Sequence, residues 1–371
     1  MKFILTIITL FGYIALHAQN EAQSFFNQAM NFVNQKDFAS ATIYYDKAIQ
    51  VDPSFTTAYY NRANLHLYAG NTPKALSDFQ KVLLLDSQFV KANLGIGNVY
   101  FTKQDYLKAI SYYKKVLEME PTNEKALNNH GIASMKIEDY DAALLSFEKS
   151  LSIGIRSSQI HFNKGVCYVK KKELYAAISG FTAAYSEDNK NLKSIFERAK
   201  CYAALEKHNE ALQDLNLYIR QLPNEPEAYY LRGVTKLKLL DFNSAVVDLN
   251  TCLEINPNHY YAMYNQAMVQ YQLKNYPQAQ FLYSKLIASD HDDAKSFMQR
   301  GLCFLALDDF KNALRDFDEA LDIDPTLAEA YFNRANVHKK LNLDRKACDD
   351  LKMAIKHGYN QGLAYENILC D

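Results

Sequence analysis

Apolar residues recur along this chain with a period of 34 residues. Ten consecutive units start at residues 22, 56, 90, 124, 158, 192, 226, 260, 294 and 328, and no insertion interrupts them. In the first part of each unit, apolar residues favour positions 3, 4, 7, 8 and 11, which is the spacing of one helix face. A second set follows at positions 20 and 24. The pattern predicts two helices in every unit and therefore a repeat array.

Two positions in every unit are small. Position 20 is alanine in all ten units: Ala41, Ala75, Ala109, Ala143, Ala177, Ala211, Ala245, Ala279, Ala313 and Ala347. Position 8 is glycine or alanine, for example Gly97 and Ala63. Antiparallel helices approach closely only where small side chains meet. We therefore interpret positions 8 and 20 as facing each other, where a leucine would overpack the contact at about 1–3 kcal/mol.

The boundaries between the helices are also marked in the sequence. Position 16 is Asp or Asn in seven units, which suits the start of the second helix. These residues are Asp37, Asn71, Asp105, Asp139, Asp241, Asn275 and Asp309. Proline closes five units, at Pro53, Pro121, Pro223, Pro257 and Pro325. Because proline cannot continue a helix, it ends the second one.

This pattern resembles the tetratricopeptide repeat over about nine-tenths of the chain, since the order and period of the small, aromatic and proline positions agree with that family. Aromatic residues replace its tryptophan at position 4, as at Phe25, Tyr59, Tyr229, Phe297 and Tyr331. The resemblance implies an all-α solenoid, a right-handed superhelix of helix-turn-helix units. It also implies that the first helices line a concave groove.

The two ends depart from the repeat. Residues 1–18 combine Lys2, an apolar run and Ala18, which is typical of a secretory signal peptide. The Ala-Gln junction resembles Bacteroidetes signal peptides. We expect a periplasmic or secreted product after cleavage near Ala18; a retained signal anchor would be the only membrane attachment. Residues 19–21 form a short lead, and residues 22–361 form the ten units. Residues 362–371 match the first half of another unit, and we expect a C-terminal capping helix with Leu369 at position 8.

Charge and composition exclude several classes of protein. The 41 basic and 42 acidic residues nearly cancel, and no run of like charge stands out. This argues against nucleic-acid binding and against a polybasic membrane patch. No P-loop, serine elbow, Cys/His dyad or metal-ligand spacing is visible. We therefore expect no catalytic residues, no metal and no cofactor.

Arginine at position 7 and aspartate at position 23 occur in the same five units. One interpretation is an ion pair between the two helices, because a buried arginine requires a carboxylate. The alternative is common descent of these units from one copy. The pairs are Arg62 and Asp78, Arg198 and Asp214, Arg232 and Asp248, Arg300 and Asp316, and Arg334 and Asp350.

The six cysteines fall into two groups. Cys167, Cys201, Cys252 and Cys303 occupy helix positions where a small buried apolar residue is the ordinary role. Cys348 lies on the last second helix and Cys370 on the expected cap. In an oxidising compartment these two could form a disulfide, and two free thiols remain the alternative.

If the family fold holds, positions 2, 5, 9, 12 and 13 line the groove. Position 5 is aromatic in seven units, and units 7 to 9 add further apolar residues. Aromatic side chains anchor interfaces, although they could equally pack on neighbouring repeats. Lysines border the strip at Lys136, Lys170, Lys200 and Lys238. The candidate binding residues are Tyr60, Phe162, Phe196, Tyr230, Val234, Leu237, Tyr261, Tyr264, Met268, Tyr271, Met298, Leu302 and Phe332.

Two functions remain open. The first is a non-catalytic scaffold of the cell envelope that binds a protein or peptide in the groove. The second is an assembly component that contacts partners through its convex face or ends. Family members that clamp a chaperone's C-terminal carboxylate use Lys at position 5 and Arg at position 6. No unit here has either residue, so we expect no such clamp.

Overall fold

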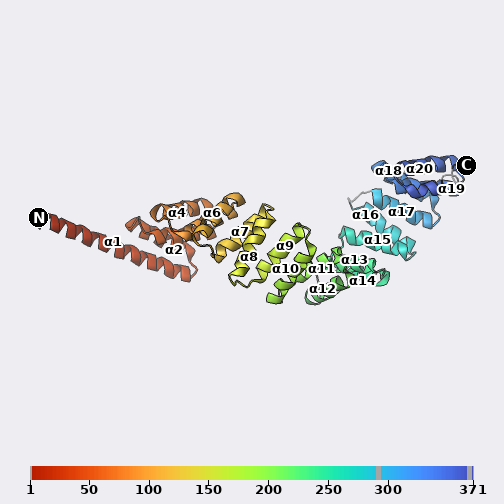
Figure 1. The fold of residues 1–371 in the computed structure, drawn as a ribbon. Helices are drawn as coiled ribbons and strands as arrows, with labels where there is room; N and C mark the ends of the chain where they lie inside the picture. Colours follow the sequence, from red (N-terminus) through yellow and green to blue (C-terminus); the bar gives the residue numbers. More distant parts are fainter. Residues whose placement is uncertain (1, 290–293, 366–369, 371) are drawn as a thin grey trace. The chain divides into compact units, whose positions relative to one another are not determined.

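The computed structural model describes residues 2–289, 294–365 and 370. They form two compact bodies, one up to Asn191 and one from Leu192 onward. Within the described residues, helices are the only regular elements and no strand occurs (Figure 1). In each body, the two helices of a unit pack on each other, and each second helix also packs on the next first helix. This confirms the all-α solenoid.

The helix bounds follow the 34-residue period. The first body contains α1 (Lys2–Asn34), α2 (Phe38–Val51), α3 (Thr56–Tyr68), α4 (Thr72–Leu85), α5 (Val90–Thr102), α6 (Tyr106–Met119), α7 (Glu124–Lys136), α8 (Tyr140–Ser152), α9 (Ser158–Lys170) and α10 (Leu174–Glu187). The second body contains α11 (Leu192–Ala204), α12 (His208–Gln221), α13 (Pro226–Lys238), α14 (Phe242–Ile255), α15 (Tyr260–Gln272), α16 (Tyr276–Ile287), α17 (Ala294–Ala306), α18 (Phe310–Ile323), α19 (Ala328–Lys340), α20 (Asp344–Lys356) and the 3₁₀ helix η1 (Asn360–Tyr365).

The turn inside each unit has one fixed shape. Position 15 has a positive φ in all ten units; Gly70 occupies it once, and the other nine residues are not glycine. Position 16 is the residue directly before the second helix, as Asp37 is before α2. Six of the seven Asp and Asn residues expected there accept a hydrogen bond from a backbone N–H of the first turn. Asn275 also stands at the start of its helix, α16, but its side chain makes no such bond.

The small residue at position 8 has a different partner from the one expected. A Cβ added at Gly97 would lie 2.5 Å from the ring of Tyr113, and one at Gly131 would lie 2.6 Å from Phe147. Both rings stand at position 24. Position 8 is therefore small because the large side chain at position 24 presses against the first helix. A Cβ added at Gly233 would also lie 3.4 Å from the backbone oxygen of Ala245 at position 20, so both positions of the second helix lie against position 8 there. The alanine at position 20 is fully buried in every unit.

The two ends of the chain extend the helical array. Helix α1 runs without a break from Lys2 to Asn34 and includes Ala18. After α20, the chain forms the 3₁₀ helix η1, which begins two residues before the capping helix expected over residues 362–371. The expected position of Leu369 lies outside the described residues. Among the described residues, none of the helices has the combined length and apolar character needed to cross a membrane.

Candidate functional site

One face of the first helices is open to solvent in every unit. Positions 2 and 13 are exposed in all ten units, position 8 is buried in all ten, and positions 6 and 9 are mostly half-buried. Steps of four, three and four residues keep positions 2, 6, 9 and 13 on one side of a helix. We call these four positions the first-helix stripe. It is the surface on which a partner could contact successive repeats.

In the second body, the stripe carries several apolar side chains. Tyr261 on α15 is 65% exposed. Val234 on α13, Met268 on α15 and Leu302 on α17 occupy position 9 and are half-buried. Because these residues come from three consecutive first helices, they form an apolar surface that crosses neighbouring repeats.

The aromatic residues at position 5 lie beside the stripe and belong to the packing between elements. The ring of Tyr60 is 5.9 Å from Phe79 and 5.2 Å from Phe89. Each position-5 ring reaches the ring at position 24, a neighbouring second-helix ring, or the connection that leads to the next unit. The further pairs are Phe162–Phe181, Phe196–Tyr218, Tyr230–His259, Tyr264–Tyr283 and Phe332–Tyr359.

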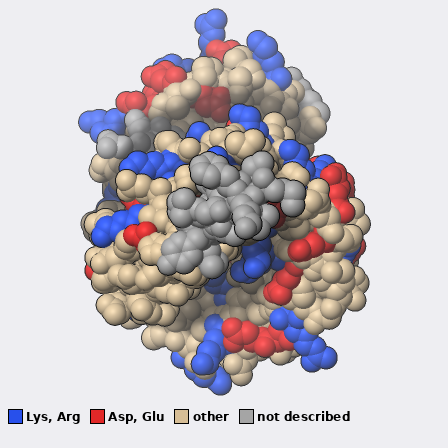
Figure 2. Space-filling view, turned by 90° about the vertical axis from the view of Figure 1, so that its left-hand side faces the viewer, with Lys and Arg blue, Asp and Glu red and all other residues tan. Residues whose placement is uncertain are grey.

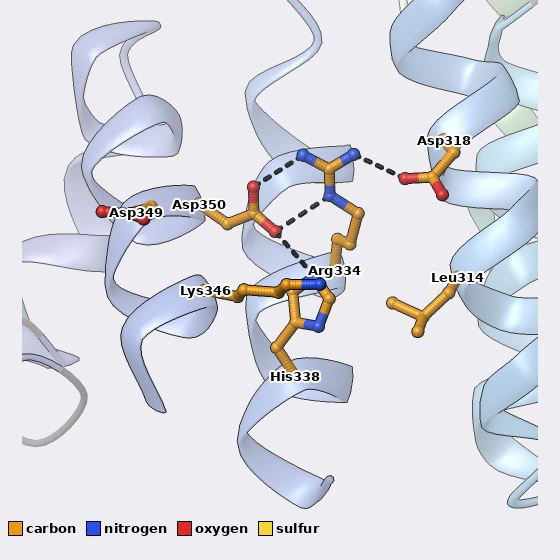
Figure 3. Close-up of a pocket in the computed structure, with 7 residues that line it drawn as sticks. All are labelled: Leu314, Asp318, Arg334, His338, Lys346, Asp349 and Asp350. Atoms are coloured by element: carbon orange, nitrogen blue, oxygen red, sulfur yellow. Dashed lines mark hydrogen bonds and ion pairs between the residues drawn. The ribbon is translucent and has the colours of Figure 1, made fainter. Parts of the chain in front are cut away.

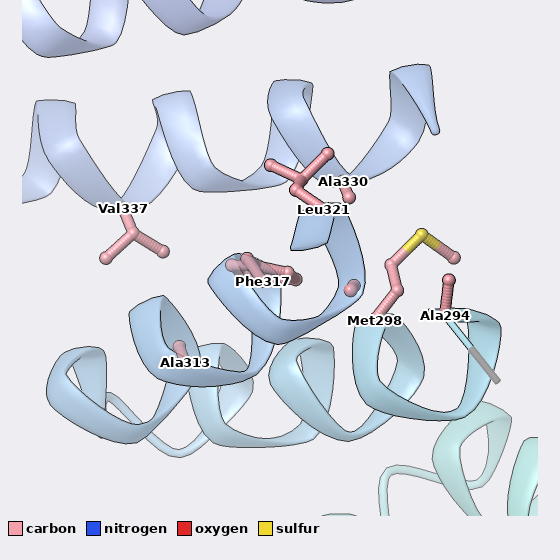
Figure 4. Close-up of a cluster of buried hydrophobic side chains, with 8 residues drawn as sticks. Ala294, Met298, Ala313, Phe317, Leu321, Ala330 and Val337 are labelled. Atoms are coloured by element: carbon pink, nitrogen blue, oxygen red, sulfur yellow. The ribbon is translucent and has the colours of Figure 1, made fainter. Parts of the chain in front are cut away.

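Three further candidates are less accessible than expected. Leu237 and Tyr271 at position 12 are half-buried against the core. Met298 is only 3% exposed and packs with Ala294, Phe317 and other core residues (Figure 4). Its expected role as a groove residue is wrong, because its thioether fills the space between α17, α18 and α19.

The first body has a different stripe. Four lysines occupy positions 2 and 13 of α5, α7 and α9: Lys91, Lys125, Lys136 and Lys170. Amide side chains lie between them. Asn98 Oδ1 accepts hydrogen bonds from Tyr113 Oη and Asn129 Nδ2, both at 2.9 Å. This network links α5, α6 and α7.

The structure brings together all five arginines at position 7 with the aspartates at position 23. In each unit, Nε and Nη2 of the arginine donate to the two carboxylate oxygens at 2.6–2.9 Å. Figure 3 shows Arg334 and Asp350 in this geometry, with His338 Nε2 also 3.5 Å from Asp350 Oδ2. The arginines are therefore occupied within the fold.

The arginine has a further partner that the sequence analysis missed. In four units, Nη1 donates to position 25 of the preceding unit; Arg334 Nη1 lies 2.6 Å from Asp318 Oδ1. The other three acceptors are Asp46, Asn216 and Ser284. Burial opposes the charge of Arg334, but its hydrogen bonds to Asp350 and Asp318 outweigh this and raise its pKa. Each such arginine joins its own two helices to the previous repeat.

The cysteines separate into one bonded pair and four buried thiols. Cys348 and Cys370 form a disulfide, with sulfurs 2.15 Å apart and Cα atoms 4.8 Å apart. The other four are free and buried. Burial raises the pKa of the Cys303 thiol to about 12 and that of the Cys167 thiol to about 11. At neutral pH these thiols are protonated and poorly nucleophilic.

The next two features are possible metal-binding clusters and the distribution of charged side chains on the surface. In the part of the chain that the structure describes, no cluster of three or more His, Cys, Asp or Glu residues could hold a metal ion. On the face drawn in Figure 2, basic and acidic side chains lie interspersed, without one continuous basic surface.

Models of the tetratricopeptide repeat match residues 22–55, 60–124, 226–259, 261–292 and 301–342. Human sperm-associated antigen 1 is 33% identical over 82 residues, and Hsp70-Hsp90 organizing protein 1 of Glycine max is 24% identical over 90 residues. These matches cover 22% and 24% of this chain, but only 9% and 16% of the two relatives.

Among solved structures, the C-terminal part of a TPR repeat-containing protein from Cytophaga hutchinsonii is similar. Its TM-score is 0.57 at 19% identity, over 64% of this chain and 97% of that one. A tetratricopeptide repeat protein from Parabacteroides merdae has a TM-score of 0.49 at 21% identity, over 67% and 99% of the two chains. At such identities the likeness concerns the fold alone.

Proposed function

Because the chain belongs to the tetratricopeptide repeat family, whose members generally bind protein partners, we propose that it is a non-catalytic scaffold that binds a protein or peptide on its first-helix stripe. The observation that carries this proposal is the apolar stripe of α13, α15 and α17 in the second body. A large aromatic side chain that is 65% exposed, such as Tyr261, gains contact area only when a partner covers it.

The absence of a reaction is part of the proposal. The five arginines are engaged by aspartates, and burial suppresses the reactivity of the four free thiols. No cofactor is required for binding through apolar contacts. Because positions 5 and 6 carry neither the lysine nor the arginine of the carboxylate clamp, the partner is not a chaperone tail bound in that way.

A photocrosslinking amino acid placed at position 261 tests the stripe in cells. We expect a discrete adduct with a partner protein, and we expect that adduct to be lost when Met268 and Leu302 are also changed to alanine. The same crosslinker at position 281, on a second helix, serves as the control. Adducts at position 281 with none at position 261 would overturn the proposal.

The alternative function uses the second helices. Phe281 on α16 is 51% exposed, and Val247 on α14 is also exposed. A hollow of about 280 Å³ beside Phe281 is lined by Leu253, Met263 and Leu282, among other residues. These features favour an assembly component that contacts its partner through the convex side implied by the family fold. The crosslinking control decides between the two.

We also propose that the protein is exported to the cell envelope and cleaved near Ala18. Two observations support this: the basic start and apolar run of residues 2–16, and the Cys348–Cys370 disulfide, since disulfides persist in oxidising compartments. Amino-terminal sequencing of the protein from a periplasmic fraction tests it. Recovery of the intact chain from the cytoplasm would contradict it.

A further inference from the structure

The first body carries a donor-rich surface that the proposed function leaves unused. Its stripe contains four lysines and no carboxylate over five units, in a chain whose acidic residues outnumber its basic ones by one. The second body's stripe, in contrast, mixes lysines with Glu197, Glu227 and Glu329. Because the charged residues of the first body's stripe are all lysines, this stripe favours a negatively charged ligand.

The four stripe lysines are available for binding. Each is exposed, and the ion pairs found among the described residues of the first body use Arg62 and other lysines, namely Lys108, Lys164 and Lys171. Lys91 has acidic neighbours, because it shares a hollow of about 300 Å³ with Asp86 and Glu120. The lysines of α7 and α9 therefore contribute most of the free positive charge.

The surface between the lysines adds hydrogen-bond donors and a small apolar area. Asn98 Oδ1 is already used by Tyr113 and Asn129, so it is the amide nitrogen of Asn98 that remains to donate to a ligand. Ile132 on α7 and Val166 on α9 occupy position 9 and are half-buried. A ligand on this surface would therefore contact lysine ammonium groups at positions 2 and 13. Between them it would contact the amide nitrogen of Asn98 and two aliphatic side chains, Ile132 and Val166.

The spacing fits an extended chain segment. Lys125 and Lys136 are eleven residues apart on α7, which corresponds to about 16 Å along the helix. An extended peptide covers that distance with about five residues. Nucleic acid fits less well, because bases stack on aromatic side chains and the stripe of α5, α7 and α9 contains none.

We propose that the stripe of α5, α7 and α9 binds an extended acidic protein segment with an aliphatic residue between its carboxylates. The proposal rests on the proposed function only in that both use exposed faces of first helices. It concerns the other body and different chemistry, so each can fail alone.

Fluorescence anisotropy with the full chain tests it. The probe is a labelled twelve-residue peptide with four glutamates spaced around leucines, and its matched form has glutamine at the same four positions. We expect the acidic peptide to bind at least ten-fold more tightly, and the difference to shrink between 50 and 300 mM NaCl because exposed charges are screened. Equal binding of the two peptides would overturn the proposal.

Two charge-matched variants locate the site. The first changes the four stripe lysines to glutamine: Lys91, Lys125, Lys136 and Lys170. The control changes four lysines of the second helices to glutamine: Lys74, Lys114, Lys115 and Lys149. We expect the first variant to lose at least about five-fold in affinity for the acidic peptide, from four exposed contacts. The control should lose less than two-fold, and equal losses would show that only net charge matters.

Two further measurements separate the remaining outcomes. A single-stranded twelve-nucleotide DNA that binds as tightly as the acidic peptide would show a general polyanion surface and overturn the proposal. The variant with alanine at Tyr261, Met268 and Leu302 should bind the acidic peptide as the unchanged chain does. Binding of the acidic peptide by this variant would therefore support the site in the first body even if the crosslinking test of the second body failed. Circular dichroism of each variant confirms that the exposed substitutions leave the helices intact.

Discussion

The two bodies are built from the same repeat but differ in the residues at positions 7 and 23, where the two helices of a unit contact each other. In the second body, four of five units place an arginine at position 7 and an aspartate at position 23. In the first body, only Arg62 and Asp78 do so. In the fourth unit, positions 7 and 23 are His130 and Ser146, which lie within hydrogen-bond distance of each other. In the fifth unit, the same two positions are Lys164 and Gly180. The repeat therefore tolerates several solutions at this helix contact.

Position 25 of the preceding unit takes part in this contact. Asp46 and Asp318 accept a hydrogen bond from arginine at position 7 of the next unit, whereas Asn250 accepts one from Gln266. Before His130 the same position is Lys114, whose charge would repel an arginine. Before Lys164 it is Glu148, and the two form an ion pair of 3.2 Å. The contact thus involves three positions spread over two repeats.

The exposed stripes differ independently of this contact. The first body presents lysines and amides, whereas the second presents Tyr261, Met268 and Leu302. The helices that carry these residues are all 13 residues long, and each has a buried glycine or alanine at position 8. Residues that hold the repeat together and residues that meet a partner therefore occupy separate faces. One face can change without the other.

The largest expected effect is the loss of one partner of a buried ion pair in the second body. Asp316 is fully buried and accepts two hydrogen bonds from Arg300, at 2.7 and 2.8 Å. Asp316→Ala leaves the arginine charge without its partner and should lower the free energy of unfolding of α17 and α18 by about 3–5 kcal/mol. Ser146→Ala in the first body removes a neutral hydrogen bond and should cost about 1 kcal/mol.

Hydrogen exchange resolved by helix is the appropriate measurement, because a repeat array does not unfold as one unit. The double variant Arg300→Leu with Asp316→Leu is the control. It should recover much of the loss, since no uncompensated charge remains. A loss below about 1 kcal/mol for Asp316→Ala would show that the two bodies are stabilised in the same way.

The second prediction concerns the disulfide of the second body. The first body has a single cysteine, Cys167, and so cannot form one within itself. Cys348 and Cys370 are 22 residues apart in the sequence. Reduction, or Cys370→Ser, should lower the stability of α19 and α20 by about 3 kcal/mol on the chain-entropy model. The first body should keep its exchange rates. Six reactive thiols in the unfolded, unreduced protein would contradict the disulfide.

The sequence was sufficient to predict the helices and the pairing of positions 7 and 23, because both repeat within one unit. The third partner at position 25 was missed, because that residue precedes the arginine by 16 and belongs to the previous unit. Comparing position 7 of each unit with position 25 of the unit before would have found it. A pattern inside one repeat does not reveal contacts between repeats.

The binding surface was less predictable for a related reason. Met298 and Tyr261 are both apolar residues of first helices, yet one is 3% and the other 65% exposed. Position 5 is covered by the ring at position 24 and by the chain entering the next unit. The period alone does not show this coverage. The small residue at position 8 was explained by position 20 alone, whereas its large partner at position 24 lies one helical turn further along.

The third prediction asks whether the two bodies share the geometry of the turn. Leu240 in the second body and Gln104 in the first both have φ of 61° at position 15. A left-handed conformation is unfavourable for residues with a Cβ, so glycine at either site should stabilise its repeat by about 1 kcal/mol. Thermal unfolding of Leu240→Gly and Gln104→Gly measures this. Gly70→Ala should show the opposite sign, and a gain in only one body would show that the turns differ.

The smallest expected effect is a pH dependence of the first body through His130. Burial, with a smaller contribution from Lys114, lowers its pKa, while the charge of Asp139 opposes this. The neutral ring is close enough to hydrogen-bond Ser146 Oγ, at 2.8 Å from Nδ1. Because the folded pKa lies below the unfolded value of about 6.5, this stability is present above that value and is lost as the pH falls through the folded pKa.

Hydrogen exchange of α7 and α8 at pH 7.5 and pH 5.5, corrected for intrinsic rates, should therefore show faster opening at the lower pH. His130→Gln, which cannot gain a proton, should remove that difference and leave the pH response of α17 and α18 unchanged. The corresponding contact of the second body, between Arg300 and Asp316, contains no histidine and should contribute no such change. An equal response of both helix pairs in His130→Gln and in the unchanged chain would assign the pH dependence to other groups.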